Sequence, residues 1–365
     1  MFLFKPNLSI LCRMYLRAIK YLTPLVLYLT AYVSFSSSGW LTWLPLFYAF
    51  GFIPLLELGL QPDASNLSQA EEELACKDLL FDLILYFIVP LQWVTLFYFL
   101  FQMQDPSLIL LEKVGRVIGM GLLCGTFGIN VGHELGHRVH PFEKFLAKAS
   151  LLTSLYMHFF IEHNKGHHKR VATPEDPSSA RFGESLYRFW PRTIVFSYWS
   201  AWTIAEEERK KRGWSFISLH NEMVLMHLIQ AALIAGIALW FGIGGVIYFC
   251  CAALMGILLL ETVNYIEHYG LARKPTGSGS YEKVMPAHSW NSNHVIGRMM
   301  LFELSRHSDH HYKASRKYQL LRHHDEAPQM PTGYPGMIIL SLWPPLWFSI
   351  MNRRIRQLGH YESAA

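Results

Sequence analysis

The chain has 365 residues, of which 52% are hydrophobic and only 16% are charged, and its formal net charge is +5. Soluble domains carry about 25% charged residues, so this composition excludes an ordinary soluble domain. The basic residues lie beside long apolar runs, which is typical of a membrane protein and gives no indication of nucleic-acid binding.

Six apolar segments are long enough to cross a membrane as helices, since a crossing takes about 20 residues. They cover residues 16–35, 40–60, 79–102, 114–133, 223–241 and 246–266. We expect a tight turn at 242–245, and we expect the polar loop 61–78 to end in a short helix. A further apolar stretch, 334–350, contains three prolines, so it is expected to lie in the membrane interface or to pack beneath the bundle.

The distribution of basic residues predicts the topology. Lys5, Arg13, Arg17 and Lys20 precede the first apolar run without an acid among them, which places the N-terminus in the cytoplasm. With six spans, segments 134–221 and 267–365 then lie on the cytoplasmic side as well. Both are rich in Lys and Arg, whereas the turns 36–39 and 242–245 assigned to the outside carry none.

Nine histidines occupy four segments that this topology brings to the cytoplasmic face. They are His133, His137, His163, His167, His168, His268, His307, His310 and His311. Spacings of three and four residues put rings on one face of a helix, as two ligands of one metal require. Neutral imidazole is a common transition-metal ligand, and one metal accepts about six ligands at most, so nine rings indicate two metals.

Acidic residues stand close to these histidines in the sequence. Four are direct neighbours, and a fifth lies in the proline-rich stretch 173–177: Glu134, Glu162, Glu267, Asp309 and Asp176. Ligating rings usually donate their second N–H to a carboxylate, and we expect that role here, with direct ligation as the alternative. The remaining histidines lack metal-ligand spacing, and His323-His324 is the pair most open to another role.

Two other classes of protein share parts of this pattern. The segment 133–137 also matches H-E-x-x-H, in which two histidines bind zinc and the glutamate acts as a general base. A hydrolytic zinc site uses three protein ligands and has no need of six more histidines. A metal transporter would place polar residues within its spans, whereas these histidines gather at span ends and beyond.

Three segments carry a family resemblance: 264–270 (NYIEHYG), 305–311 (SRHSDHH) and 173–177 (TPEDP). The chain resembles the membrane-bound alkane 1-monooxygenases, within the histidine-rich di-iron hydroxylases and desaturases, from its first span to about Pro345. The resemblance implies an all-α integral membrane protein with six transmembrane helices and a cytoplasmic histidine-rich cap, forming one domain over residues 1–365. It also implies a bacterial inner-membrane location.

The activity implied by the resemblance is the O2-dependent terminal hydroxylation of medium-chain n-alkanes to 1-alkanols. Two iron ions held by the nine histidines would carry it out, with electrons from a rubredoxin that an NADH-dependent rubredoxin reductase reduces. The five cysteines form no C-x-x-C pair, so a rubredoxin is expected to act in trans unless one is fused beyond Ala365. A fatty acyl desaturase and an alkylaromatic side-chain hydroxylase are the alternatives.

An alkane has no polar group, so its binding must be hydrophobic. At about 0.8 kcal/mol per buried CH2, eight carbons gain roughly 6 kcal/mol. We expect a slot among the first four spans that opens to lipid and ends at the metals, with Trp40, Trp43, Phe50 or Phe52 setting its depth. The basic residues Lys165, Lys169, Arg170 and Arg322 are expected to attract an acidic electron carrier or lipid head groups.

Overall fold

The computed structural model describes residues 16–216, 218–277 and 279–358, and the basic residues Lys5 and Arg13 lie outside these ranges. The described residues form helices joined by loops, with two isolated β-bridges, Pro275–Tyr281 and Asn291–Gln329, and no strand among them. The expected all-α fold class is therefore confirmed for this part of the chain.

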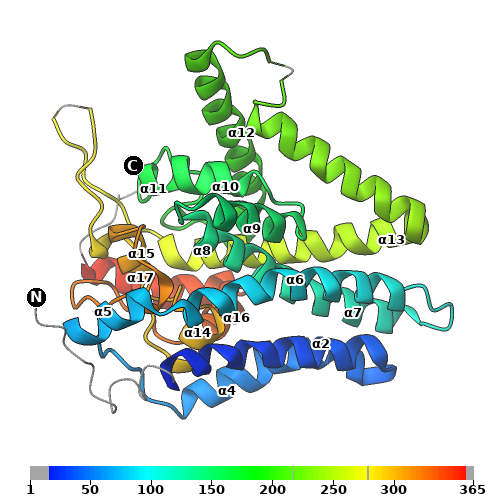
Figure 1. The fold of residues 1–365 in the computed structure, drawn as a ribbon. Coiled ribbons are helices and arrows are strands. Elements are labelled where there is room, and N and C mark those ends of the chain that lie inside the picture. The colour runs from blue at the N-terminus through cyan, green and yellow to red at the C-terminus, as the bar shows by residue number, and fades with distance from the viewer. Residues whose placement is uncertain (1–15, 217, 278, 359–365) are drawn as a thin grey trace, which may run out of the picture.

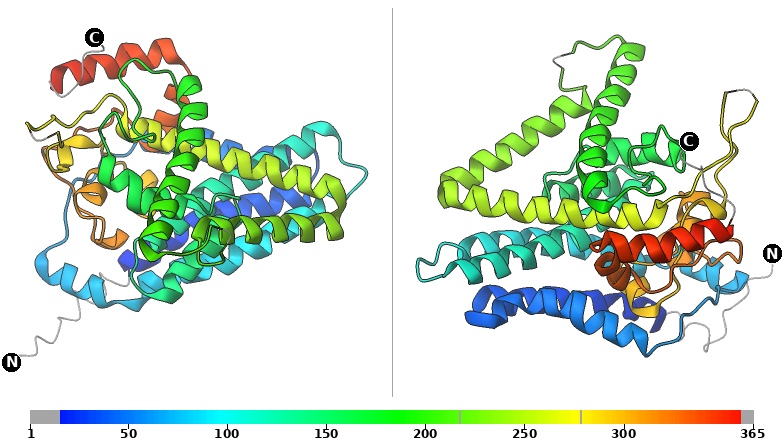
Figure 2. Two further views of the ribbon diagram at one scale, coloured as in Figure 1. Left: turned by 90° about the horizontal axis from the view of Figure 1, so that it is seen from above. Right: turned by 180° about the vertical axis from the view of Figure 1, so that it is seen from behind.

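Five helical segments are long and apolar enough to cross a membrane, which makes the chain a multi-pass membrane protein. They are Leu16–Ser36, Gly39–Leu58, Leu79–Gln102, Leu110–Gly136 and Glu222–His268. The first four match the first four expected spans to within a few residues. Figures 1 and 2 show α2 (Val26–Ser36), α6 (Leu79–Gln102), α7 (Leu110–Leu123) and part of α13 (Glu222–His268) running side by side.

The last two expected spans form one helical segment. α13 has 47 residues, and its backbone leaves the helical region at Gly242, where φ is +66°. Figure 1 shows the chain turning back there, so α13 consists of two legs. The four-residue turn expected at 242–245 was wrong in extent, because the single glycine reverses the chain and residues 243–245 are already helical.

The second and fourth spans are not uniform α-helices. The second comprises η2 (Gly39–Trp43), α3 (Leu44–Phe47), the π-helical η3 (Tyr48–Phe52) and α4 (Ile53–Leu58). The fourth continues from α7 through the π-helical η4 (Cys124–Ile129) into α8 (Asn130–Gly136). π-Helical turns are rare and often lie at functional sites, and both of these border the site described below.

The polar segments fold as further helices, and those that follow α13 lie toward one end of the bundle (Figure 1). The loop 61–78 ends in α5 (Gln69–Lys77), as expected. Before α13 come α9 (Pro141–Leu152), α10 (Phe159–Glu162), η5 (His163–His167), α11 (His168–Arg170) and the long α12 (Leu186–Arg212). After α13 come η6 (Pro286–His288), α14 (Val295–Met300), α15 (His307–Tyr312), η7 (Tyr318–Leu320), α16 (Tyr334–Ser341) and α17 (Pro344–Leu358), the last two taking up the proline-containing stretch 334–350.

Glu303 anchors the C-terminal region to the first span. This carboxylate is 3% exposed and accepts hydrogen bonds from Tyr21 Oη (2.6 Å), Lys20 Nζ (3.0 Å) and Arg298 Nε (2.6 Å). Burial raises the pKa of Glu303, but the cations Lys20 and Arg298 outweigh burial and bring the pKa to about 2. The carboxylate is thus ionised, and it joins the first span to the 298–303 segment, which is far away in the sequence.

Glycines let the fourth span approach the second leg of α13 closely. A Cβ atom on Gly256 would lie 2.6 Å from Cys124 Cβ and 3.0 Å from the backbone nitrogen of Gly125. Small residues commonly permit such contacts between membrane helices. This contact fixes α13 against η4, and so it fixes the end of α13 that carries His268.

We expect Gly256→Ala to lower the stability of the folded protein by about 1–3 kcal/mol, because the added methyl group overlaps backbone atoms that cannot move freely. Thermal unfolding in detergent, followed by circular dichroism, measures the change. Gly236→Ala in the same helix is the matched control, since its Cβ would meet nothing within 4 Å. Equal melting temperatures for the two variants would contradict the close packing.

Candidate metal centre

The nine clustered histidines meet where α8, η5, α11, the C-terminal end of α13 and α15 come together. They separate into two groups, and within each group the ligating ring nitrogens all lie within 4.8 Å of one another. The five-histidine cluster contains His133, His137, His163, His168 and His310. The four-histidine cluster contains His167, His268, His307 and His311.

In the five-histidine cluster the Nε2 atoms form a closed ring. Successive distances run 3.2 Å from His133 to His137, 3.2 Å to His163, 3.0 Å to His168, 3.1 Å to His310 and 3.0 Å back to His133. A neutral imidazole nitrogen either donates or accepts a hydrogen bond. Donors and acceptors cannot alternate around five atoms, so hydrogen bonding alone cannot satisfy this ring.

A metal ion satisfies the same arrangement. Two nitrogens bound about 2.1 Å from one ion and at right angles to each other lie about 3.0 Å apart. The rings are also in the protonation state that a metal needs, because burial and neighbouring histidines lower the pKa of His163 and His310 well below the usual value. Burial brings the pKa of His168 to about 3.

The Nε2 atoms of the four-histidine cluster also lie close together. Its Nε2 atoms lie 3.2 Å apart between His167 and His311, 2.9 Å between His311 and His307, and 3.1 Å between His307 and His268. Glu267 Oε2 lies 3.2 Å from His307 Nε2, on the side where that ring faces the cluster, while Tyr334 Oη donates to the other carboxylate oxygen at 2.7 Å.

The local backbone decides which histidines pair. The prediction that histidines four residues apart share one metal was wrong for one pair. His163 and His167, four apart, fall in different clusters, and His163 pairs instead with His168. The reason is that 163–167 form a π-helical turn, whose wider winding places residues five apart on one face. The α-helical rule holds for His307 and His311, which share a cluster.

The five carboxylates singled out in the sequence differ in their partners. Asp176 Oδ2 lies 2.8 Å from His167 Nδ1, and contacts with His167 and Ser179 outweigh the effect of burial and lower the pKa of Asp176. Three others are bound by arginines: Glu134 by Arg138 (2.7 Å), Glu162 by Arg170 (2.9 Å) and Asp309 by Arg316 (2.6 Å). Glu267 faces His307 and Tyr334, as described above.

His323 and His324 lie outside both clusters. His324 Nε2 is 2.7 Å from Asp309 Oδ1, and His323 Nδ1 is 3.0 Å from the side-chain nitrogen of Asn293. His324 therefore contacts a carboxylate next to the ligands, and neither histidine of this pair joins a cluster.

Sequence reasoning missed one buried acid in the vicinity of the clusters. Glu261 lies in α13 and is 1% exposed, and three side chains hydrogen-bond to its carboxylate. An ionisable residue inside an apolar span is a signal of function by itself, and that signal was available in the sequence.

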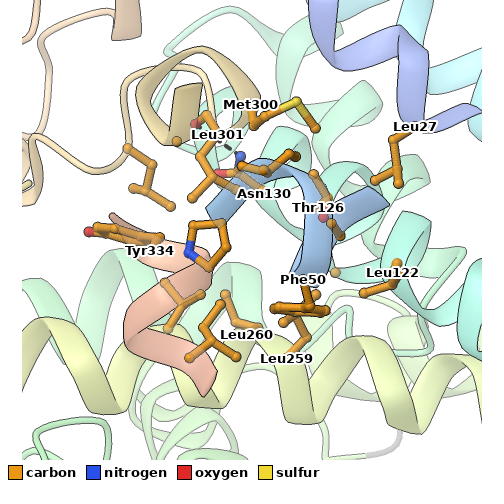
Figure 3. A pocket seen from close by; sticks show the side chains of 18 residues that line it. Leu27, Phe50, Leu122, Thr126, Asn130, Leu259, Leu260, Met300, Leu301 and Tyr334 are labelled. Atoms are coloured by element: carbon orange, nitrogen blue, oxygen red, sulfur yellow. Dashed lines mark hydrogen bonds between the residues drawn. The ribbon is translucent and has the colours of Figure 1, made fainter. Parts of the chain in front are cut away.

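An apolar cavity of ≈ 70 Å³ is lined by residues that lie close along the chain to two of the clustered histidines (Figure 3). Its lining includes Asn130, three residues before His133, and Leu304, three residues before His307. Most of the lining is aliphatic, and Asn130 Nδ2 is occupied by a hydrogen bond to the backbone oxygen of Leu301 at 3.1 Å. The cavity therefore suits an apolar molecule.

The lining of the cavity overlaps in part with the residues expected to line a slot. Phe50, on the π-helical η3, lines it, whereas Trp40, Trp43 and Phe52 do not. The lining draws on the first, second and fourth spans and also on α13, the 297–304 segment and α16, which the sequence interpretation did not include. Phe50, Leu259 and Ile338 also line a second apolar cavity, of ≈ 460 Å³.

Residues 114–341 match the family model described as fatty acid desaturase. The chain is 38% identical over 88% of its length to alkane 1-monooxygenase 2 of Alcanivorax borkumensis, covering 84% of that protein. It is 39% identical over 85% of its length to alkane 1-monooxygenase of Acinetobacter baylyi, covering 75% of it. The xylene/toluene monooxygenase hydroxylase component of Pseudomonas putida is 30% identical over 67% of this chain and 64% of its own.

Histidine clusters at the end of a bundle of membrane helices, together with these matches, define the class: a histidine-rich membrane oxidoreductase of the monooxygenase type. Within that class the chain belongs to the alkane 1-monooxygenase family.

We expect Asp176→Asn to weaken binding of a metal at the four-histidine cluster about 10–100-fold, because the buried carboxylate orients His167 through its Nδ1. Metal titration of the metal-free protein measures the affinity. Glu175→Gln is the matched control, since this neighbouring carboxylate is exposed. Unchanged affinity in Asp176→Asn would show that His167 needs no such support.

Proposed function

We propose that this protein hydroxylates the terminal carbon of medium-chain n-alkanes to 1-alkanols, using O2 and electrons delivered by a rubredoxin. The observation that carries the proposal is the pair of buried imidazole clusters in a bundle of apolar helices that also holds an apolar cavity. An alkane offers only hydrophobic contacts, and the cavity provides them next to groups that hold redox metals.

The nine histidines are the proposed ligands of two iron ions, with the five-histidine cluster holding one and the four-histidine cluster the other. When bound, the two irons supply the activation of O2 that attack on an unactivated C–H bond requires. Burial keeps the rings of the five-histidine cluster neutral, and the hydrogen bond between Asp176 and His167 orients the His167 ring. Glu134, Glu162, Glu267 and Asp309 are proposed as further supports of the ligands, and Glu267 is placed so that direct ligation is open to it.

The cavity would bind the alkane with its terminal methyl group toward Asn130 and Leu304, the lining residues nearest the histidines in sequence. Selectivity for the terminal carbon would then follow from the shape of the cavity. An alkane that enters lengthwise would reach Asn130 and Leu304 with its terminal methyl group first. Exclusion of water by the aliphatic lining protects the reacting carbon from competing solvent.

The proposed membrane arrangement has six crossings, because the two legs of α13 would each span the bilayer. The N-terminus and both histidine-rich segments, 134–221 and 267–365, would face the cytoplasm of a bacterium from its inner membrane, as one domain over residues 1–365. Support comes from the position of the histidines at the ends of the fourth span and of α13, with the remaining ligands in the segments that follow.

Electrons would come from a rubredoxin that an NADH-dependent rubredoxin reductase reduces. Lys169 is exposed, follows His168 directly, and forms no ion pair with any residue in the described ranges. Lys165, Arg170 and Arg322 instead bind Glu208, Glu162 and Glu72. The face around Lys169 is thus the proposed docking point for an acidic electron carrier.

We expect the iron-loaded protein in lipid nanodiscs, supplied with rubredoxin, its reductase, NADH and O2, to convert octane to 1-octanol. Gas chromatography of the products measures this conversion. The same protein treated with an iron chelator is the control and should give no product. Absence of octanol from the loaded protein would overturn the proposal.

The alternatives give different products from the same assay. A fatty acyl desaturase would introduce a double bond into an acyl ester. This alternative is supported by the match to the family model described as fatty acid desaturase. An alkylaromatic side-chain hydroxylase would oxidise the methyl groups of xylene, the substrate class printed in the name of the Pseudomonas putida relative. A preference for the acyl ester over octane would favour the desaturase, and a preference for xylene would favour the alkylaromatic hydroxylase.

We expect Phe50→Ala to shift the preference toward longer alkanes, because Phe50 lines both the ≈ 70 Å³ and the ≈ 460 Å³ cavity and its removal would enlarge the space they share. Each additional CH2 that is accommodated is worth about 0.8 kcal/mol, or roughly fourfold in relative kcat/KM. Competition between octane and dodecane measures the shift. Phe47→Ala is the matched control, since Phe47 lines only the larger of these two cavities, and an equal shift in both variants would contradict the role of Phe50.

A further inference from the structure

A line of aromatic rings leads away from the five-histidine cluster. The ring of Phe159 stacks on that of His163 with their centroids 4.8 Å apart, and Tyr156 stacks on Phe159 at 5.8 Å. His158 contacts Tyr156 on one side at 4.5 Å and Tyr198 on the other at 5.3 Å. Successive ring contacts thus join a proposed metal ligand to Tyr198.

The line continues from Tyr198 to the protein surface. On α12, the ring centroid of Tyr198 lies 6.3 Å from that of Trp199 and 6.5 Å from that of Trp202. Trp199 is 61% exposed, whereas Tyr156 at the other end of the line is 2% exposed. Tyrosine and tryptophan lose an electron more readily than most side chains, because the radical that forms is delocalised over the ring. Oxidisable rings therefore stand at the buried end, in the middle and at the exposed end of the line.

Tyr198 donates a hydrogen bond to a base. Its Oη lies 3.0 Å from Nε2 of His227, and Nδ1 of the same imidazole lies 2.7 Å from the backbone oxygen of Met223. A carbonyl oxygen only accepts hydrogen bonds, so Nδ1 carries the proton of the neutral ring and Nε2 is its acceptor. His227 is thus oriented to take up the phenolic proton of Tyr198. It is not one of the clustered histidines.

We propose that Tyr198 is a redox-active tyrosine, which gives one electron to the iron centre after the centre has reacted with O2 in the absence of an alkane. The inference rests on the two-iron centre proposed above. The electron passes across the rings of Tyr156 and Phe159, and the iron centre is reduced by one electron. Tyr198 becomes a neutral radical, because its proton moves from Oη to Nε2 of His227.

This transfer protects the metal ligands. An oxidising equivalent that meets no substrate attacks the side chains nearest to it, which at this centre are imidazoles. Transfer to Tyr198 moves it away from them, and the exposed Trp199 connects Tyr198 to the solvent. There a water-soluble one-electron reductant, such as a thiol, returns the electron and is itself oxidised, while His227 returns the proton to Tyr198.

Electron paramagnetic resonance tests the proposal. The full chain in nanodiscs, loaded with Fe²⁺, is mixed with O2 without alkane or further reductant and is frozen rapidly. We expect an organic radical signal that becomes narrower when the protein is made with ring-deuterated tyrosine. Tyr198→Phe should lose most of this signal. His227→Gln should lose it as well, although Tyr198 is still present, because an amide does not take up the proton.

Tyr265→Phe is the matched control and should keep the signal. Tyr265 is also a buried tyrosine, but its Oη donates at 2.7 Å to the backbone oxygen of Glu184, which is no base. Mass spectrometry after the same reaction gives a second measurement. It should find more oxidation of His133 and His163 in Tyr198→Phe than in the wild-type protein, which a purely structural role of Tyr198 does not predict at unchanged melting temperature.

Three results would overturn the inference: no tyrosine radical in the wild-type protein, a signal of wild-type strength in folded Tyr198→Phe, or equal loss of signal in Tyr265→Phe. If Tyr198→Phe does not fold, His227→Gln and the deuterated protein still decide. Failure of the inference is separable from failure of the proposed function. A protein that forms the radical but makes no octanol would contradict only the function, whereas one that makes octanol without forming the radical would contradict only the inference.

Discussion

The structure depends on the burial of nine imidazole rings with their Nε2 atoms about 3 Å apart. The closed ring of five neutral imidazoles cannot be paired entirely by hydrogen bonds, and buried polar groups without partners are costly. A cation bound there would turn that cost into stabilisation. The rest of the fold serves to bring four distant segments of the chain to one place and to bury the rings there.

The position of the clusters at the end of the bundle explains how a set of polar ligands and an apolar cavity occur in one fold. His133 lies near the end of the fourth span and His268 at the end of α13, where apolar helices give way to polar segments. The cavity includes Asn130, three residues before His133, and is lined mostly by aliphatic side chains (Figure 3). In the proposed function, a site at this boundary would receive an apolar substrate from the membrane side.

Much of this arrangement was predictable from the sequence. The spacing of the histidines and the hydrophobic runs indicated the metal clusters and the first four spans, because both patterns are local. The split between His163 and His167 was not predictable from an α-helical rule, since it depends on a π-helical turn that no residue in 163–167 signals. The contribution of α13 and α16 to the cavity also depends on tertiary packing, which the first four spans alone do not reveal.

α13 is the element that links the two halves of the site. Leu259 and Val263, four residues apart, share the helix face that lines the cavity. Glu261 is two residues from each, about 200° around the helix, so it points away from that cavity. One helix thus lines the cavity on one side, buries Glu261 among Tyr156, Thr193 and Asn264 on the other, and delivers His268 at its end.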